Sequence, residues 1–313
     1  MLDIPWSLTK IARRLFRDMH IKINELEPGT DADEGDWTLV IEPQDSWWNL
    51  HLAELWPYRD LVRMFVRRDF VAVYKQTMLG PLWFFVQPLL TTLMFTVIFS
   101  GVAKISTGGV PPMLFYLAGT TPWNYFASCL AKTSGTFIAN AHLFGKVYFP
   151  RLVTPLSLAV SNLIQFGIQF LLFAGFLAWY LFRGAALRPD WWQILWLTPV
   201  LLLLLGLLGL GAGVLVSALT TKYRDLTFLV TFGVQLAMYA TPIIYPLASV
   251  PARYRLLIEL NPLSAIIESF RAVFLGGAIP WAQLGYSASI TGMLLLFGII
   301  VFNRVEKNFM DTI

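Results

Sequence analysis

The chain has 313 residues and a formal net charge of +4; 57% of its residues are hydrophobic and only 13% are charged. Soluble domains average roughly 45–50% apolar and about 25% charged residues, so this composition excludes an ordinary soluble domain and predicts an integral membrane protein. The basic balance does not indicate nucleic-acid binding, because Lys and Arg fall mainly in short segments beside apolar runs, as membrane topology requires.

Residue types that carry chemistry are too scattered to predict a catalytic or metal site. His20, His51 and His142 lie far apart without ligand spacing. Cys129, the single cysteine, lies in an apolar run and is interpreted as a packing residue. We therefore predict no catalytic residues, no metal site and no cofactor bound by this chain. Four carboxylates each have a basic neighbour that gives them a structural explanation: Asp60, Asp69, Glu259 and Glu268.

Residues 1–57 are predicted to form a cytosolic N-terminal extension. The first residues are charged and mixed rather than basic and then apolar, so no cleavable signal peptide is expected. The stretch from Trp6 to Met19 has the spacing of a short basic amphipathic helix. An acidic linker follows at residues 31–36, and the β-branched run at residues 38–41 has the composition of a short strand.

Residues 58–77 are predicted to form an amphipathic interfacial helix. Apolar residues recur at the i, i+3, i+4 spacing of one helix face, while Asp60, Arg63 and Arg67 occupy the opposite face. The basic residues favour a helix that lies on the anionic inner leaflet rather than one that crosses the bilayer. Gly80-Pro81 then turns the chain into the membrane.

Residues 78–313 are predicted to form the transmembrane domain, an all-α fold with six membrane-spanning helices. A hydrocarbon core of about 30 Å requires about 20 apolar residues in each helix. Basic residues gather beside the inner ends of these helices, so the positive-inside rule places both termini in the cytosol. The six spans are predicted at residues 82–102, 113–131, 155–181, 194–218, 227–246 and 285–302.

The stretch between Leu247 and Gly285 is too polar to span the membrane and too apolar for an ordinary loop. Asn261 followed by Pro262 predicts a helix start, with the Asn as cap and the Pro at the first helical position. We expect two short re-entrant half-helices before the last span, since irregular backbone at membrane depth requires burial in protein or a cavity. A helical hairpin resting on the outer surface is the alternative.

The glycine-rich run Gly209–Gly213 does not indicate a phosphate-binding loop, because no strand precedes it and no Lys follows the glycines. Small residues four apart in a membrane helix instead indicate the close approach of a neighbouring helix. We therefore predict that Gly209 and Gly213 serve packing. No Walker-type loop occurs elsewhere in the chain, so ATP hydrolysis by that route is not expected.

An ordered set of segments runs from residue 58 to the end of the chain: YRDLVRMFVRRDFVAVYKQTMLGPLWFFVQPLL (58–90), Asn140, LFGKVYFP (143–150), TKYRDL (221–226), TPIIYP (241–246), ELNPLSAIIESFR (259–271) and VEKNFMDTI (305–313). The set resembles the type-2 ABC exporter permeases for polysaccharides, the inner-membrane subunits for O-antigen, capsule and teichoic acid export. The resemblance covers roughly residues 38–313. Val73 departs from it, because a basic residue often stands there. The first 36 residues exceed the usual pattern, so nothing is carried onto them.

The resemblance implies a homodimer of permeases in the bacterial inner membrane, joined to two separate ATP-binding subunits that carry the ATP and Mg. The family's pore lies at the dimer interface, and its cytosolic loops transmit ATP-driven closure. The implied cargo is a lipid-linked polysaccharide. The segment from Asn140 to Pro150 resembles the helix that docks on the ATPase, and residues 222–226 resemble a second, smaller contact.

The resemblance also assigns residues to sites. The docking residues are Asn140, Lys146, Tyr148, Phe149, Lys222, Arg224 and Asp225, and the outer gate residues are Pro246, Asn261, Pro262 and Arg271. Positive-inside topology alone would explain the charge of the docking loop, but not its aromatic residues.

Two further groups of residues are candidates for substrate contact. An anionic lipid-linked glycan needs cations near the inner headgroups, for which the candidates are Arg59, Arg63, Arg67 and Lys75. Anchoring of the helix to anionic lipid explains these cations equally well. Aromatic rings could line the pore for the polymer, although most aromatic residues of membrane proteins are interface anchors; the candidates are Trp83, Phe84, Tyr116, Trp123, Tyr125, Tyr239 and Tyr245.

Three classes of function compete. The first is the permease of a polysaccharide exporter, which is not itself an enzyme. The second is a permease of the same class that exports a small hydrophobic drug or lipid, but such proteins usually lack the long amphipathic segment at 58–76. The third is a membrane-embedded enzyme of glycan-lipid metabolism, which would need convergent ionisable residues in a long loop or within the spans, and this chain has few of them.

Overall fold

The computed structural model describes residues 52–75, 78–144, 146–147, 149–220, 223 and 225–309, and this part of the chain is helical without any strand. The expectations for residues 6–19, 31–36 and 38–41 lie outside it. The helices, with η marking 3-10 and π segments, are η1 (Leu52–Tyr58), α2 (Arg59–Tyr74), η2 (Gly80–Leu82), α3 (Trp83–Phe95), η3 (Thr96–Val102), α4 (Pro112–Ser134), α5 (Thr136–Phe144), α6 (Val153–Phe182), α7 (Trp191–Thr220), α8 (Leu226–Tyr239), η4 (Leu247–Ser249), α9 (Ala252–Glu259), α10 (Pro262–Leu275) and α11 (Trp281–Phe309).

Four helices among the described residues are long and apolar enough to cross a bilayer. They are α3 continued by the π-helix η3 (Trp83–Val102), α6, α7 and the part of α11 from Trp281 to Val305. The predicted spans at 113–131 and 227–246 correspond to α4 and α8, which are helical but do not meet both conditions. The chain is therefore an all-helical membrane protein with at least four candidate transmembrane helices.

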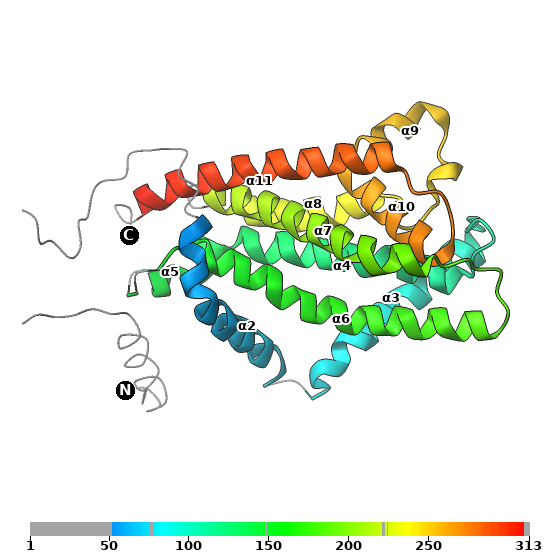
Figure 1. Ribbon diagram of the computed structural model, residues 1–313, viewed down its shortest axis with the longest axis horizontal. Helices are drawn as coiled ribbons and strands as arrows, with labels where there is room; N and C mark the ends of the chain where they lie inside the picture. Colours follow the sequence, from blue (N-terminus) through cyan, green and yellow to red (C-terminus); the bar gives the residue numbers. More distant parts are fainter. Residues whose placement is uncertain are drawn as a thin grey trace, which may run out of the picture. The chain divides into compact units, whose positions relative to one another are not determined.

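Helix α4 differs from the other long helices because protein surrounds it. It contacts α3, α6, α7, α8 and α10, and Figure 1 shows it running between α6 and α7. Fifteen of its 23 residues are buried. A helix enclosed by other helices tolerates polar side chains that a lipid-facing helix would expel, which explains why its composition alone is not that of a span.

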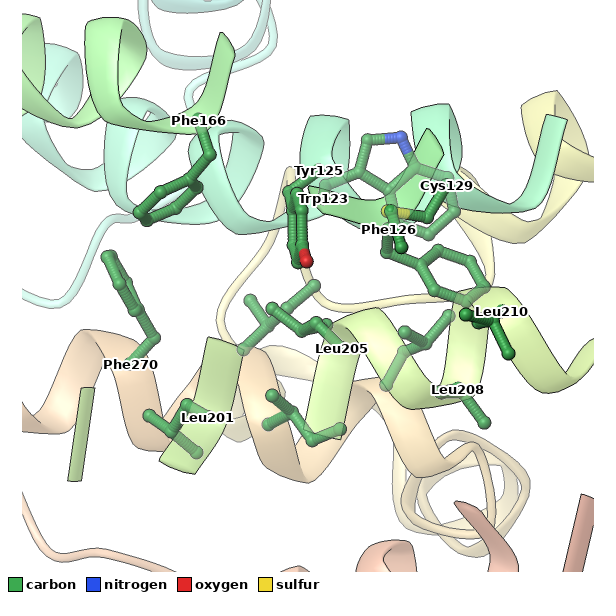
Figure 2. Close-up of a cluster of buried hydrophobic side chains, with 14 of the residues drawn as sticks. Trp123, Tyr125, Phe126, Cys129, Phe166, Leu201, Leu205, Leu208, Leu210 and Phe270 are labelled. Atoms are coloured by element: carbon green, nitrogen blue, oxygen red, sulfur yellow. The ribbon is translucent and has the colours of Figure 1, made fainter. Parts of the chain in front are cut away.

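The core lies where α4, α6, α7 and α10 meet (Figure 2). Tyr125 and Phe126 of α4, Phe166 of α6 and Phe270 of α10 are all at most 5% exposed. The Tyr125 and Phe166 rings meet edge to face with centroids 5.8 Å apart. The predicted packing role of Cys129 is confirmed, because its side chain is fully buried in the same cluster.

The glycines of α7 allow two close helix crossings. A Cβ at Gly209 would lie 2.8 Å from the Cβ of Cys129, and one at Gly213 would lie 2.6 Å from the Cβ of Thr133. Both contacts are with α4, so the predicted packing role of these glycines is confirmed. Gly211 faces the other way, where α11 approaches through Gly298.

Helix α2 is amphipathic as predicted, but its apolar side has a protein partner. Phe65 is buried, and Leu61 and Val62 pack against the same core cluster. The neighbouring helix is α6. Packing against the bundle therefore accounts for much of the apolar pattern that the sequence attributes to the membrane surface.

Helix α8 ends earlier than the predicted span at 227–246. It has 14 residues and stops at Tyr239, because Pro242 disfavours helical backbone at the residue before it. At 1.5 Å per residue the helix is about 21 Å long, shorter than the bilayer core of about 30 Å.

The region after α8 folds into two short helices of different character. The predicted start of α10 is confirmed: Asn261 is the cap, its side chain accepts a hydrogen bond from the Leu263 backbone N–H at 3.1 Å, and Pro262 is the first helical residue. Eleven of the 14 residues of α10 are buried, in contact with α4, α7 and α11. Helix α9 has no buried residue. A hairpin resting on the surface therefore does not describe α10.

The crossing of α7 and α11 yields a test of the packing. Gly298→Ala should lower the free energy of unfolding by about 1–3 kcal/mol, because the added Cβ would lie 2.6 Å from the Gly211 carbonyl oxygen. Gly292→Ala on the same helix is the control, since nothing lies within 4 Å of its added Cβ. Thermal unfolding of the detergent-solubilised protein measures both, and equal melting temperatures would contradict the close crossing.

Candidate functional site

Arg271 of α10 is a buried cation that holds the turn following α8. We name Ala240–Tyr245 the α8 turn. The Arg271 side chain is 5% exposed; its Nη1 donates to the Pro242 carbonyl oxygen and its Nη2 to that of Ile243. Glu268, one turn earlier, balances the charge with Oε1 at 3.1 Å from Nη1. The guanidinium lies 3.8 Å from the ring centroid of Phe115 of α4, a cation–π contact.

Asn261 holds the other end of the α8 turn. Its Nδ2 donates to Oγ1 of Thr241 at 2.9 Å and to the Ala240 carbonyl oxygen at 3.3 Å. The Tyr245 hydroxyl donates to the Tyr239 carbonyl oxygen at 3.0 Å. Four consecutive residues just beyond the end of α8, 240–243, thus each present an acceptor to Arg271 of α10 or to its cap Asn261.

Gly119 of α4 permits this arrangement. A Cβ at this position would lie 2.6 Å from Nη2 of Arg271 and 3.2 Å from the Ile243 carbonyl oxygen. Any side chain would therefore push the guanidinium away from the turn. Sequence reasoning missed Gly119 and Phe115; the signal available was a glycine and an aromatic residue within one turn of the same span.

The predicted outer gate residues converge in part. Asn261 and Arg271 both contact the α8 turn, and Pro262 begins α10 beside it. Pro246 is extended (φ −75°, ψ 145°) and leads into η4. The Arg271 Nε is buried without a hydrogen-bond partner among the described residues. The guanidinium therefore bonds the turn and Glu268 through its two Nη atoms alone.

The four predicted headgroup cations all lie on the exposed side of α2 or just after it. Arg63 pairs with Asp60 at 3.2 Å, but both side chains are mostly exposed, so the pair is weak. Arg59 lies 5.9 Å from the Trp56 ring centroid. Arg67 and Lys75 are also exposed. The basic side of α2 therefore faces away from the bundle.

Arg68, which the sequence interpretation left out of the headgroup group, has a packing role. Its Nε donates to Oδ1 of Asp69 at 2.9 Å, and its guanidinium lies 4.6 Å from the centroid of the buried Phe65 ring. The basic neighbours predicted for the four carboxylates are confirmed as ion pairs. These are Asp60–Arg63, Asp69–Arg68, Glu259–Arg255 and Glu268–Arg271.

The predicted docking residues divide into buried and exposed positions. Asn140 is 7% exposed and donates to the Thr136 carbonyl oxygen within α5. Phe149 is 7% exposed and packs between Phe65 of α2 and Phe144 of α5. Lys146 and Asp225 are exposed, whereas Tyr148, Lys222 and Arg224 lie outside the described residues. Asn140 and Phe149 thus shape the loop from within rather than presenting its surface.

The predicted pore aromatics divide in the same way. Tyr116, Trp123 and Tyr125 are at most 5% exposed and lie in the core of the chain itself; Figure 2 shows the last two. Phe84 and Tyr245 are partly buried. Trp83 on α3 and Tyr239 on α8 are exposed, at 47% and 58%. Only those two, among the seven candidates, are exposed on the surface of the chain.

The described residues contain no group of three His, Cys, Asp or Glu side chains that could hold a metal ion. The side chains of Arg271 and Asn261 at the α8 turn instead donate to backbone carbonyls, to the Thr241 hydroxyl and to Glu268. Their arrangement is suited to fixing a conformation of the chain rather than to bond chemistry.

Residues 60–275, from α2 to the end of α10, match the ABC-2 type transporter family. The chain belongs to this family. Such a permease is the membrane component of a transporter and has no ATPase domain of its own.

Relatives of the permease extend the match along most of its length. It is 31% identical over 255 residues to the O-antigen export system permease protein RfbA of Klebsiella pneumoniae, covering 80% of this chain and 94% of the relative. It is 29% identical to the Myxococcus xanthus protein of the same name, covering 84% of this chain and 98% of the relative. It is 23% identical to the polysialic acid transport protein KpsM of Escherichia coli, covering 73% and 87%.

The Arg271 contacts of the permease yield a test of the α8 turn. Arg271→Met removes the partners of two backbone carbonyls and leaves Glu268 unpaired, a change that costs about 3–5 kcal/mol at a buried site. In a Cys129→Ala background with Ile244→Cys as reporter, a water-soluble maleimide should label the reporter several-fold faster than in the protein with Arg271.

Arg255→Met is the matched control, because Arg255 is 55% exposed and pairs with Glu259 on the surface of α9. Exposed pairs of this kind contribute about 0–1 kcal/mol, so the labelling rate should not change. An unchanged rate in Arg271→Met would show that Arg271 does not hold the turn.

Proposed function

We propose that this permease exports a lipid-linked polysaccharide of the O-antigen or capsular kind from the cytosolic side of the bacterial inner membrane. The observation that carries the proposal is the match to two O-antigen export permeases along 94% and 98% of their length, at 31% and 29% identity. The match to a polysialic acid transport protein supports the same class of cargo. A partner subunit supplies ATP hydrolysis.

Six spans complete the membrane domain in this proposal. Helix α4 has 23 residues, which at 1.5 Å per residue extend about 35 Å. This length is enough to cross the bilayer core, and the less apolar composition of α4 is that of a helix enclosed by other helices. Helix α8 crosses together with the α8 turn, and the buried α10 fills the remaining depth as a re-entrant half-helix. In Figure 1, α3, α4, α6, α7, α8 and α11 run back and forth along the bundle, with the C-terminal end of α11 near α5. This supports the predicted cytosolic placement of the C-terminus.

The transporter is a homodimer of permeases with two ATP-binding subunits in this proposal. Helix α8 has no buried residue, and α3 has two, so both offer apolar faces to lipid or to a second copy. Exposed polar residues recur every four positions on α8, at Thr227, Thr231 and Gln235. Together with the exposed ring of Tyr239, they support a sugar-contacting wall on α8 in a conduit between the two copies.

The α8 turn is the outer gate in this proposal. A gate must change conformation without leaving buried carbonyls unpaired. Arg271 and Asn261 hold four acceptors through side chains rather than through a helix ladder, and side-chain contacts can be exchanged when α10 moves. The exposed Lys146 and Asp225, at the two cytosolic loops, contact the ATPase.

The basic side of α2 recruits the anionic substrate headgroup in this proposal. Arg63→Ala combined with Arg67→Ala should lower the surface polymer several-fold at an unchanged membrane level of the protein, since each basic side chain near an anionic surface contributes about 1 kcal/mol. Polymer per unit of permease is the measurement. Arg63→Lys with Arg67→Lys is the charge-preserving control. Full export by the double alanine variant would contradict the proposed role of α2 in recruiting the headgroup.

Deletion of the gene in its host tests the cargo. Lipid-linked glycan should accumulate on the cytosolic side of the inner membrane while surface polymer is lost, and a plasmid copy should reverse both. Unchanged polymer in a strain whose parent expresses the permease would contradict the glycan assignment and favour a small hydrophobic drug or lipid as cargo.

A further inference from the structure

Lys132 is a cation whose position is fixed by helix packing. It lies in the last turn of α4, and its Nζ donates to Oδ1 of Asn162 on α6 at 2.7 Å. Asn162 is 1% exposed, and its Nδ2 lies 3.7 Å from Sγ of Cys129. The buried amide is thus oriented with its oxygen toward Lys132. Lys132 as a whole residue is exposed, while the hydrogen bond of its Nζ is partly buried, so the ammonium is held beside a buried amide at the edge of the bundle.

Asp69 of α2 interacts electrostatically with Lys132. Its Oδ1 accepts from Arg68, while its Oδ2 is buried without a hydrogen-bond partner in the part of the chain that the structure describes. A buried carboxylate oxygen without a partner is costly. Two cations, Arg68 and Lys132, therefore share one incompletely satisfied carboxylate, and this corner of α2, α4 and α6 carries excess positive charge.

Simpler explanations of Lys132 account for only part of this arrangement. A lysine in the last turn of a helix is favoured by the helix dipole, and a lysine at an inner helix end follows the positive-inside rule. Neither explanation requires the buried Asn162 that accepts a hydrogen bond from the ammonium. Neither requires a carboxylate on another helix, Asp69, that offsets the charge of Lys132 without a hydrogen bond to it.

We propose that Lys132 binds the phosphate of the lipid-linked substrate as it passes from α2 into the bundle, and that Asp69 balances this lysine when the site is empty. The inference rests on the proposed function and deepens its headgroup step. Lysine binds phosphate as a compact point charge. An arriving phosphate replaces Asp69 as the counter-charge of Lys132, which couples headgroup binding to the electrostatic interaction between α2 and α4.

The two residues should respond with opposite signs. Polyprenyl diphosphate in phosphatidylcholine nanodiscs is the probe, and its Kd for the intact permease complex is the readout. Lys132→Gln should weaken binding roughly fivefold, the worth of one basic side chain beside an anionic headgroup. Asp69→Asn should tighten binding, because it removes the competing negative charge. A purely structural tie between α2 and α4 would make both variants bind more weakly, and that result would overturn the proposal.

Controls separate charge from folding and from other steps. Lys132→Arg should restore most of the binding lost in Lys132→Gln, and Lys104→Gln, which alters an exposed lysine of the α3–α4 loop, should leave the Kd unchanged. A wild-type complex that does not bind the probe would contradict the headgroup step of the proposed function. A wild-type complex that binds it, with an equal Kd for Lys132→Gln, would overturn the Lys132 assignment alone.

Two competition experiments identify which phosphate compound the site binds. Phosphatidylglycerol added to the nanodiscs as a competitor of the probe tests whether any anionic lipid fills the site, and inorganic pyrophosphate as a competitor tests a free anion. Neither is expected to compete with the probe at equal concentration. Competition by phosphatidylglycerol would show a general lipid site, and competition by inorganic pyrophosphate would show a free-anion site; either result would overturn the substrate assignment.

Discussion

Buried backbone carbonyls must find partners within the protein, and the end of α8 shows how this chain meets that constraint. Pro242 stops α8 after 14 residues, short of the distance across a bilayer core. The carbonyl groups that the stop leaves open are taken up by Arg271 and Asn261. This requirement brings α10 into the bundle, places a guanidinium against Phe115 and leaves no room for a side chain at Gly119.

The same constraint connects the fold to transport. An uninterrupted helix satisfies its own backbone and is rigid, whereas a turn held by two side chains can change partners and still remain satisfied. In the proposed mechanism such a turn lies at one end of the bundle, and the electrostatic pair of Lys132 and Asp69 lies beside the cationic helix α2 at the other, so that each end has a part that can change partners. The enclosed α4 contacts α8 and α10 and carries Lys132 in its last turn, so it joins the two.

Much of this could be predicted from the sequence, because apolar length and helix caps are local signals. Each of the six predicted segments contains a helix, although α8 ends at Tyr239, and the cap formed by Asn261 and Pro262 is confirmed. The partner of each surface was not predictable, since it depends on residues far apart in the chain. The apolar side of α2 packs on α6, and Tyr116, Trp123 and Tyr125 pack inside the core. The role of Gly119 depends on Arg271, which lies more than a hundred residues away.

Reconstitution of the permease with its ATP-binding subunit in proteoliposomes measures the central claim most directly. Labelled lipid-linked glycan should cross the bilayer only when ATP and the ATP-binding subunit are present, and a subunit unable to hydrolyse ATP should abolish the movement. Movement of a small hydrophobic dye in place of the glycan, under the same ATP hydrolysis, would contradict the account.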